Sequence, residues 1–152
     1  MKFTVWATLF LLGLLSRGYC QQSVNNDTSQ IYQIRYDISS GAKNGTNRHL
    51  VITKDSVLYD SRSYYYGSSV KIHLPIQWIN VWDDLVKMIN FSDFDKIKSN
   101  ESRQPADGFD ESITIQTSKK THTEMNGYFN GTPTVALKDK LLEVLTQLKD
   151  FF

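Results

Sequence analysis

The sequence predicts an α+β fold, in which a mostly antiparallel sheet of about five strands carries two helices on one face. First, the stretch IYQIRYDI at residues 31–38 alternates between polar and apolar positions, which is the period of a half-buried strand. Second, apolar residues recur at spacings of three and four in two later segments, as expected for amphipathic helices. Third, the elements follow the order strand, strand, strand, helix, strand, strand, helix, so both helices can cover the same side of one sheet.

The strands are separated by segments rich in turn-forming residues. Residues 39–47 contain two glycines and an Asn-Gly pair, which indicates a hairpin loop. The third strand continues the meander until a break near Tyr66 and Gly67, and Ser118, Lys119 and Lys120 form the turn of a later hairpin. The predicted strands are residues 31–38, 48–53, 56–66, 110–117 and 121–129.

Two helices are predicted from apolar periodicity. Pro75 is expected in the first turn of the earlier helix, because the missing N–H of proline would be unpaired there anyway. Thr132 is expected to cap the later helix, with Pro133 just inside it. Residues 90–108 between them are polar and predicted to be irregular. The apolar face of the earlier helix consists of Trp78, Val81, Trp82, Leu85, Val86, Met88 and Ile89. The apolar face of the later helix consists of Leu137, Leu141, Val144, Leu145 and Leu148. In the irregular segment, Phe91, Phe94 and Ile97 are expected to pack beneath the helix.

The N-terminal segment has the pattern of a secretory signal peptide. Lys2 precedes an apolar run at residues 3–15, which is too short to cross about 30 Å of hydrocarbon. Cleavage after Cys20 would leave a flexible leader at 21–30 and a single domain at 31–152, and lipid attachment at Cys20 is the alternative. We therefore expect a secreted or periplasmic protein with no membrane span.

Charge and cysteine content exclude several classes of function. Loss of residues 1–20 would remove Lys2 and Arg17, leaving 15 basic and 16 acidic residues. This near-neutral balance gives no electrostatic reason to expect binding to nucleic acid or to an anionic membrane. Cys20 is the only cysteine, so the chain cannot form a disulfide within itself. No cofactor or metal is expected.

The clearest candidates for chemistry are histidines and a His-x-Glu pair. In a strand, His122, Glu124 and Asn126 would share one face, which we expect to be the solvent-facing one. A metal site would need a third ligand, from His49 or His73 through the fold. A small hydrolase that uses these histidines with a carboxylate is one alternative, although the chain has no G-x-S-x-G, H-E-x-x-H or P-loop motif.

Two loops are the candidate partner-binding surface. Lys43 and Asn44 lie in the first predicted hairpin loop, where binding groups often concentrate. Tyr64, Tyr65 and Tyr66 would offer a large contact area to a protein or a glycan if they are exposed. The alternative is an ordinary strand in which Tyr65 packs inward. Five N-x-S/T sequons would mark surface loops if they carry glycans, at Asn26, Asn44, Asn90, Asn100 and Asn130.

Four stretches together resemble the emfourin-like group of small bacterial proteins, which is known for an inhibitor of thermolysin-like metalloproteases. They are IRYDISSGAKNGTNRHLVI, WDDLVKMINFSDFDKI, ADGFDESITIQTSKKTHT and TPTVALKDKLLEVLTQL, and they cover about residues 31–148. The resemblance implies an α+β fold and, as a function, inhibition of a secreted protease. It assigns no inhibitory residue, and residues 59–74 look longer than the corresponding connection in that group.

The sequence thus leads to three hypotheses. The first is a non-enzymatic binding domain, and an inhibitor of metalloproteases in particular, whose partner is a secreted protease or another protein. The second is a carbohydrate- or envelope-binding module that uses exposed tyrosines. The third is the small hydrolase with a histidine-based site.

Overall fold

The computed structural model describes residues 31–127 and 133–151. It contains one six-stranded antiparallel sheet with the strand order β4-β3-β2-β1-β5-β6. The strands are β1 (Ile31–Ser40), β2 (Thr46–Thr53), β3 (Ser56–Ser63), β4 (Ser68–Pro75), β5 (Phe109–Thr117) and β6 (Thr121–Met125). The α-helices are α1 (Trp82–Met88), α2 (Phe91–Phe94) and α3 (Pro133–Gln147), and short 3₁₀ helices span Ile76–Trp78, Gln104–Ala106 and Leu148–Phe151.

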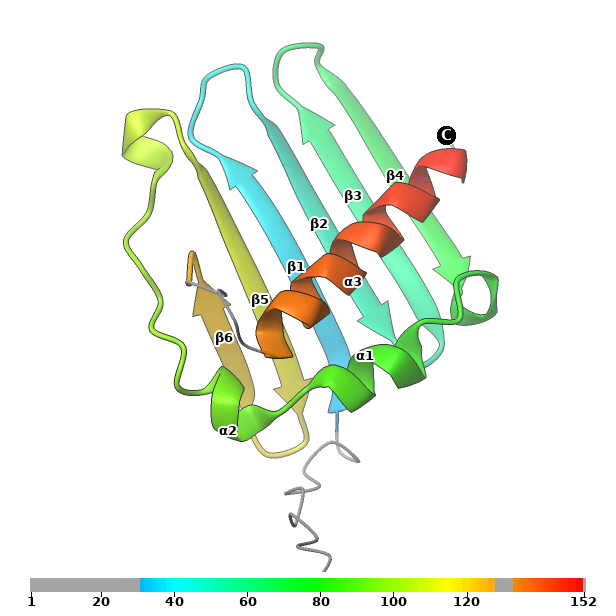
Figure 1. The fold of residues 1–152 in the computed structure, drawn as a ribbon. Helices are drawn as coiled ribbons and strands as arrows, with labels where there is room; N and C mark the ends of the chain where they lie inside the picture. The colour runs from blue at the N-terminus through cyan, green and yellow to red at the C-terminus, as the bar shows by residue number, and fades with distance from the viewer. Residues whose placement is uncertain (1–30, 128–132, 152) are drawn as a thin grey trace, which may run out of the picture.

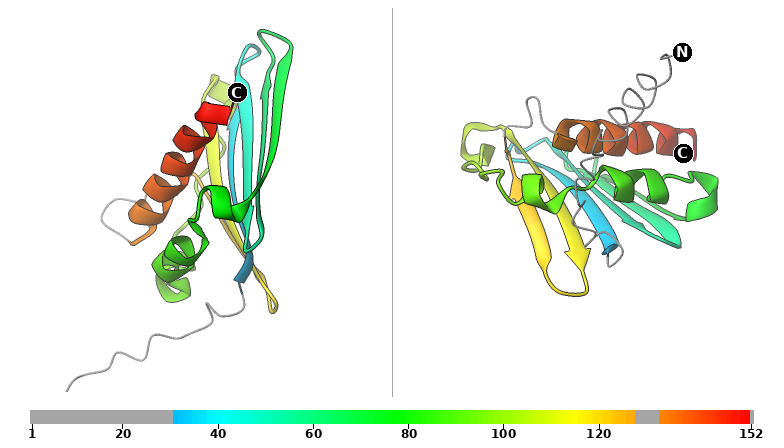
Figure 2. Two further views of the ribbon diagram at one scale, coloured as in Figure 1. Left: turned by 90° about the vertical axis from the view of Figure 1, so that its right-hand side faces the viewer. Right: turned by 60° about the horizontal axis from the view of Figure 1, so that its bottom comes forward.

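All the helices that cover the sheet lie on one of its faces (Figures 1 and 2). Helix α3 crosses that face diagonally, and α1 and α2 lie along one end of it. The predicted stripe of α3 is confirmed, because Leu137, Leu141, Val144, Leu145 and Leu148 are all buried. The sheet contributes the other half of the core through Ile34, Tyr36, Leu50, Ile52, Val57, Ile113 and Ile115. Within residues 31–127 and 133–151, no helix covers the opposite face of the sheet, as antiparallel sheets allow.

The predicted α+β fold is confirmed, but the strand count is six rather than about five. Residues 68–75 form the additional strand β4, which pairs with β3 along its whole length. Gly67 makes the turn between them with a φ of 59°, a left-handed value that glycine adopts readily. Val70, Ile72 and Leu74 alternate with polar residues, so a period of two was present in the sequence.

The start of the first helix also differs from the prediction. Pro75 ends β4 instead of opening a helix, and α1 begins at Trp82. Proline is tolerated at the end of this strand because β4 lies at the edge of the sheet. Trp78 falls before α1 and is exposed, whereas Leu85 is buried in the core. The predicted inward packing of Phe91, Phe94 and Ile97 is confirmed.

Irregularities in the backbone account for the remaining differences within the sheet. A register shift between Ile31 and Gln33 breaks the alternation of β1, so Tyr32 is exposed instead of lying beside Ile34. Strand β6 ends at Met125, and Asn126 takes a positive φ of 53°. The predicted continuation of the strand through residues 126 and 127 is therefore wrong, whereas residues 128–129 and the predicted Thr132 cap lie outside the described residues.

Candidate binding surface at the loop end

Three connections meet at the end of the sheet that lies uppermost in Figure 1. We call them the loop end: residues 41–45 between β1 and β2, residues 64–67 between β3 and β4, and residues 103–108 before β5. The first two are joined because the N–H of Tyr64 donates to the carbonyl of Gly45 at 3.1 Å. The first and third are joined because the N–H of Gly41 donates to the carbonyl of Gly108 at 2.9 Å. The loop end is therefore one continuous surface.

The structure brings all five predicted contact residues to this surface. Lys43 and Asn44 are exposed in the first loop. Tyr64, Tyr65 and Tyr66 are 53%, 63% and 79% exposed, so the alternative in which Tyr65 packs inward is wrong. Their turn projects past the ends of β3 and β4, where the sheet no longer covers them.

The tyrosines are held in a defined arrangement. The rings of Tyr65 and Tyr66 meet edge to face with centroids 4.7 Å apart. The amide of Asn47 donates to the hydroxyl of Tyr64 at 3.3 Å, which ties the tyrosine turn to β2. Exposed aromatic side chains held in place in this way lose little entropy on binding, so they are suited to protein recognition.

A buried carboxylate fixes the third loop. Asp110 accepts hydrogen bonds from Ser102 at 2.6 Å, from the N–H of Arg103 at 2.8 Å and from the amide of Asn126 at 2.7 Å. Burial alone would raise its pKa, but these hydrogen bonds outweigh burial and hold the pKa of Asp110 below its ordinary 3.8. Gln104 adds a bond to Ser39 at 2.8 Å. This network anchors residues 103–108 to the sheet.

Sequence reasoning did not place residues 103–108 in the candidate surface. They belong there because β5 runs antiparallel to β1 and pairs with it, so β5 starts where β1 ends. Phe109, the first residue of β5, is 53% exposed and adds an apolar side chain beside Ser40. The available signal was the acidic run at residues 107–111, which leads directly into the predicted strand 110–117.

The His-x-Glu pair lies at the other end of the sheet, and the prediction of a solvent-facing side was wrong. His122, Glu124 and Asn126 are only 4%, 1% and 3% exposed, on the face of β6 that the helices cover. The ring of His122 stacks on Phe91 of α2 with centroids 4.1 Å apart. The exposed side of β6 is the one with Thr121 and Thr123. Alternation between two polar faces cannot show which face a helix will cover.

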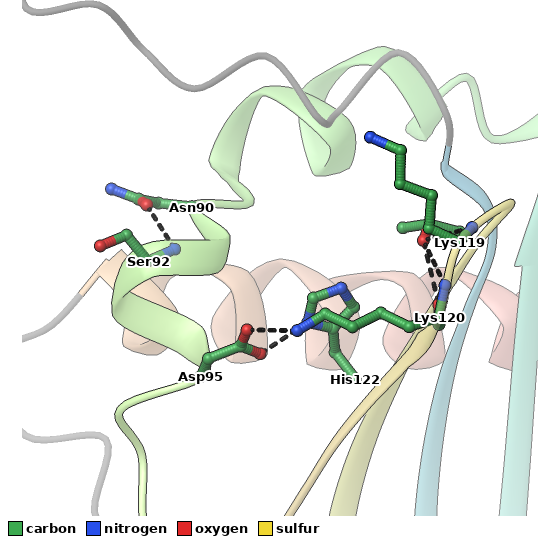
Figure 3. Close-up of polar contacts among 7 residues, drawn as sticks. Asn90, Ser92, Asp95, Lys119, Lys120 and His122 are labelled. Carbon is green, nitrogen blue, oxygen red and sulfur yellow. Dashed lines mark hydrogen bonds and ion pairs between the residues drawn. The ribbon is translucent and has the colours of Figure 1, made fainter.

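His122 links β6 to helix α2 (Figure 3). Its Nδ1 lies 2.5 Å from one carboxylate oxygen of Asp95, and Lys120 Nζ lies 2.7 Å from the other. Burial by itself raises the pKa of Asp95, but the bonds and charges of His122 and Lys120 outweigh it and leave the pKa below 3.8. Asp95 is therefore ionised at neutral pH and ties α2 to the β5–β6 hairpin.

The contacts of this His-Asp pair are those of a structural link between α2 and β6. A general base needs its second ring nitrogen directed at a nucleophile or a substrate. Nε2 of His122 is buried and, among the described residues, has no hydrogen-bond partner. His49 and His73 lie on the helix-free face, across the sheet from His122, so the three histidines do not converge. Within residues 31–127 and 133–151, no group of three potential metal ligands is present.

Glu124 is a buried carboxyl group whose pKa is raised. Burial is the main cause, and it outweighs the hydrogen bond that Oε1 accepts from the N–H of Gly127. Oε2 has no partner in the part of the chain that the structure describes. The folded protein thus keeps a proton on Glu124 at pH values where an unfolded chain has lost it.

Glu124→Gln is therefore expected to change how stability depends on pH. Because the folded state binds the extra proton, stability of the wild type should fall as pH rises above the ordinary pKa of 4.5 towards the raised value. The glutamine variant cannot ionise and should lack this decline. Urea unfolding of both proteins between about pH 4 and 8 measures it, and parallel pH profiles would contradict the assignment.

The fold is a small α+β domain in which three loops join at one end of the sheet. None of the helices in the described ranges is both long and apolar enough to cross a membrane. No model of a known protein family matches the chain, and no curated protein matches it either. The assignment of function therefore depends on the geometry of the loop end.

Proposed function

We propose that this protein is a secreted, non-enzymatic binding domain that recognises a protein partner through the loop end. The observation that carries the proposal is the joining of three loops into one surface with Lys43, Asn44 and three exposed tyrosines. Loops held by a rigid sheet are a common location for recognition residues. Tyrosine is also among the residues that contribute most to protein interfaces.

We further propose a secreted metalloprotease as the partner. The resemblance to emfourin-like proteins supports this choice, and loops that are anchored at both ends suit an inhibitor that must resist cleavage. Gly41, Gly45 and Gly108 are bonded across the loops, and Asp110 fixes the third loop from below. Such cross-links limit the local opening that proteolysis requires.

The test is a titration of a thermolysin-type metalloprotease with the purified protein, in its expected mature form of residues 21–152. Stoichiometric loss of protease activity, with a stable complex on a sizing column, is the expected result. The double variant Tyr65→Ala/Tyr66→Ala should weaken the complex by at least about 30-fold, the effect of losing one hot-spot tyrosine at about 2 kcal/mol, and by more if both tyrosines are hot spots.

Tyr32→Ala is the matched control. Tyr32 is 53% exposed, as Tyr64 is, but it lies at the start of β1, at the opposite end of the sheet. Its loss should leave the complex unchanged. Digestion of the protein by the protease would overturn inhibition, and equal weakening by both variants would overturn the placement of the contact at the loop end.

Glycan binding is the second candidate function, and the exposure of the three tyrosines favours it. Sugars stack on flat aromatic faces, however, and Tyr65 and Tyr66 meet at an interplanar angle of 88°. At most one of these two rings can therefore lie parallel to a bound sugar. On a glycan array, a wild-type signal no stronger than that of the Tyr65→Ala/Tyr66→Ala variant would exclude this candidate.

A further inference from the structure

The helix-free face of the sheet contains a shallow hollow that is separate from the loop end. It has a volume of about 370 Å³ and lies over β2, β3 and β4. Figure 2 shows in side view that the helices lie on the other side of these strands. The side chains that line it on this face are His49, Val51, Leu58, Asp60, Lys71 and His73.

The floor of the hollow is apolar. Val51 and Leu58 are direct partners across the β2–β3 pair. Leu58 is 40% exposed, whereas the neighbouring Leu50, on the face that the helices cover, is fully buried. An apolar floor of two branched side chains suits a flat hydrocarbon or aromatic group, and the volume falls within the range of small-molecule sites.

One wall of the hollow is an oriented histidine. Nδ1 of His49 lies 2.7 Å from Asp37, whose carboxylate also pairs with Arg35 at 2.6 Å. A carboxylate that holds Nδ1 fixes the ring orientation and leaves Nε2 for another partner. The carboxylate of Asp37 is thus already paired with two side chains of the protein, those of Arg35 and His49.

The other wall carries one ammonium group and one imidazole. Lys71 and His73 project from β4 on the same face, two residues apart. Lys71 pairs with Asp60 across the strands at 3.6 Å, which is a loose contact. No hydrogen bond or ion pair to His73 is found within residues 31–127 and 133–151. Both carboxylates of this region therefore have cationic partners, whereas His73 and most of the Lys71 ammonium group are free for a ligand.

We propose that this hollow binds a small organic anion. The apolar body of the ligand lies on Val51 and Leu58, and its carboxylate is held by Lys71 and His73. His49 contacts the ligand edge through Nε2. This site is independent of the loop end, so a protein partner and the anion can bind together.

The probe for the test is 2-naphthoate, with the neutral 2-naphthamide as its isosteric comparison. We expect naphthoate to bind with a Kd of about 1 mM or tighter, given typical contributions per ligand atom. Backbone amide NMR signals of residues 49–51, 58–60 and 71–73 should shift, and the naphthamide should bind at least about 5-fold more weakly, because it lacks the charge.

The double variant Lys71→Gln/His73→Gln removes the groups assigned to the carboxylate. It should weaken naphthoate binding about 10-fold, as expected for the loss of hydrogen bonds to a charged carboxylate. Lys96→Gln is the matched control, because Lys71 and Lys96 are both 72% exposed and each pairs loosely with one aspartate, at 3.6 and 3.4 Å. Lys96 lies after α2, away from the hollow.

Three results would overturn the proposal. One is that the amide NMR signals at the hollow do not shift at naphthoate concentrations up to about 10 mM, which is 10-fold above the expected Kd. Another is equal affinity for naphthoate and naphthamide. The third is unchanged binding by the double variant when its amide spectrum shows an intact sheet. The Tyr65→Ala/Tyr66→Ala variant tests only the loop end, so its effect on protease inhibition is separate from naphthoate binding at the hollow.

Discussion

Replacing Gly41 with alanine is expected to lower the free energy of unfolding by about 3 kcal/mol, the upper part of the usual range for overpacking. A Cβ at this position would lie 2.6 Å or less from three backbone atoms of Gln104. Backbone cannot move aside as the end of a flexible side chain can. Residues 41–45 and 103–108 would therefore have to separate, which also breaks the bond from Gly41 to Gly108.

Gly67→Ala is the control for this prediction. Gly67 has a φ of 59°, and a Cβ added there would have no other atom within 4 Å, so this variant tests backbone strain without a clash. We expect a cost of about 1 kcal/mol. Urea unfolding of both variants measures the difference, and a Gly41→Ala cost no larger than that of Gly67→Ala would show that the loops are not in close contact.

The Gly41 change also tests whether the loop end acts as one surface. If the proposed partner contacts the loops together, Gly41→Ala should weaken the complex although Gly41 itself presents no side chain. A Gly41→Ala protein that is destabilised and still binds normally would restrict the contact to the tyrosine turn.

Asp95→Ala is expected to lower the free energy of unfolding by about 2 kcal/mol, because it leaves Nδ1 of the buried His122 without a partner. Asp93→Ala is the matched control from the same segment. The side chains of Asp93 and Asp95 are 40% and 41% exposed, but Asp93 pairs with the exposed Lys96. Such exposed pairs contribute about 0–1 kcal/mol. Chemical denaturation at neutral pH should separate the two variants.

The effect of Asp95→Ala should also depend on pH. The pKa of Asp95 is lowered by folding, so its contribution is complete above the ordinary value of 3.8 and is lost as pH falls through the lower, folded value. The difference in stability between wild type and Asp95→Ala should therefore shrink in acid. A difference that stayed constant down to about pH 2 would mean that the carboxylate charge contributes nothing. Adding His122→Leu to Asp95→Ala should recover part of the loss, since no buried ring nitrogen is then left unpaired.

Several features of the fold could be predicted from the sequence because they depend on local periodicity. The alternation of residues 31–38 predicted β1, and the spacing of the leucines predicted the buried stripe of α3. The Asn-Gly and Ser-Lys-Lys segments predicted where two hairpins turn. The strand β4 was missed although Val70, Ile72 and Leu74 alternate with polar residues, because the meander was expected to end near Gly67 and no strand was assigned between Gly67 and Pro75.

Other features were decided only by tertiary structure. His122 and Glu124 share a strand with equally polar neighbours on the opposite face, so periodicity cannot tell which set is buried. The position of α2 over β6 decides it, through Phe91 and Asp95. Likewise, the sequence shows that residues 41–45, 64–67 and 103–108 are loops, but not that they touch. Residues 41–45 and 103–108 meet because β5 pairs with β1, and residues 64–67 join them because β3 pairs with β2. The pairing of β5 with β1 is set by long-range packing, which a local sequence pattern does not show.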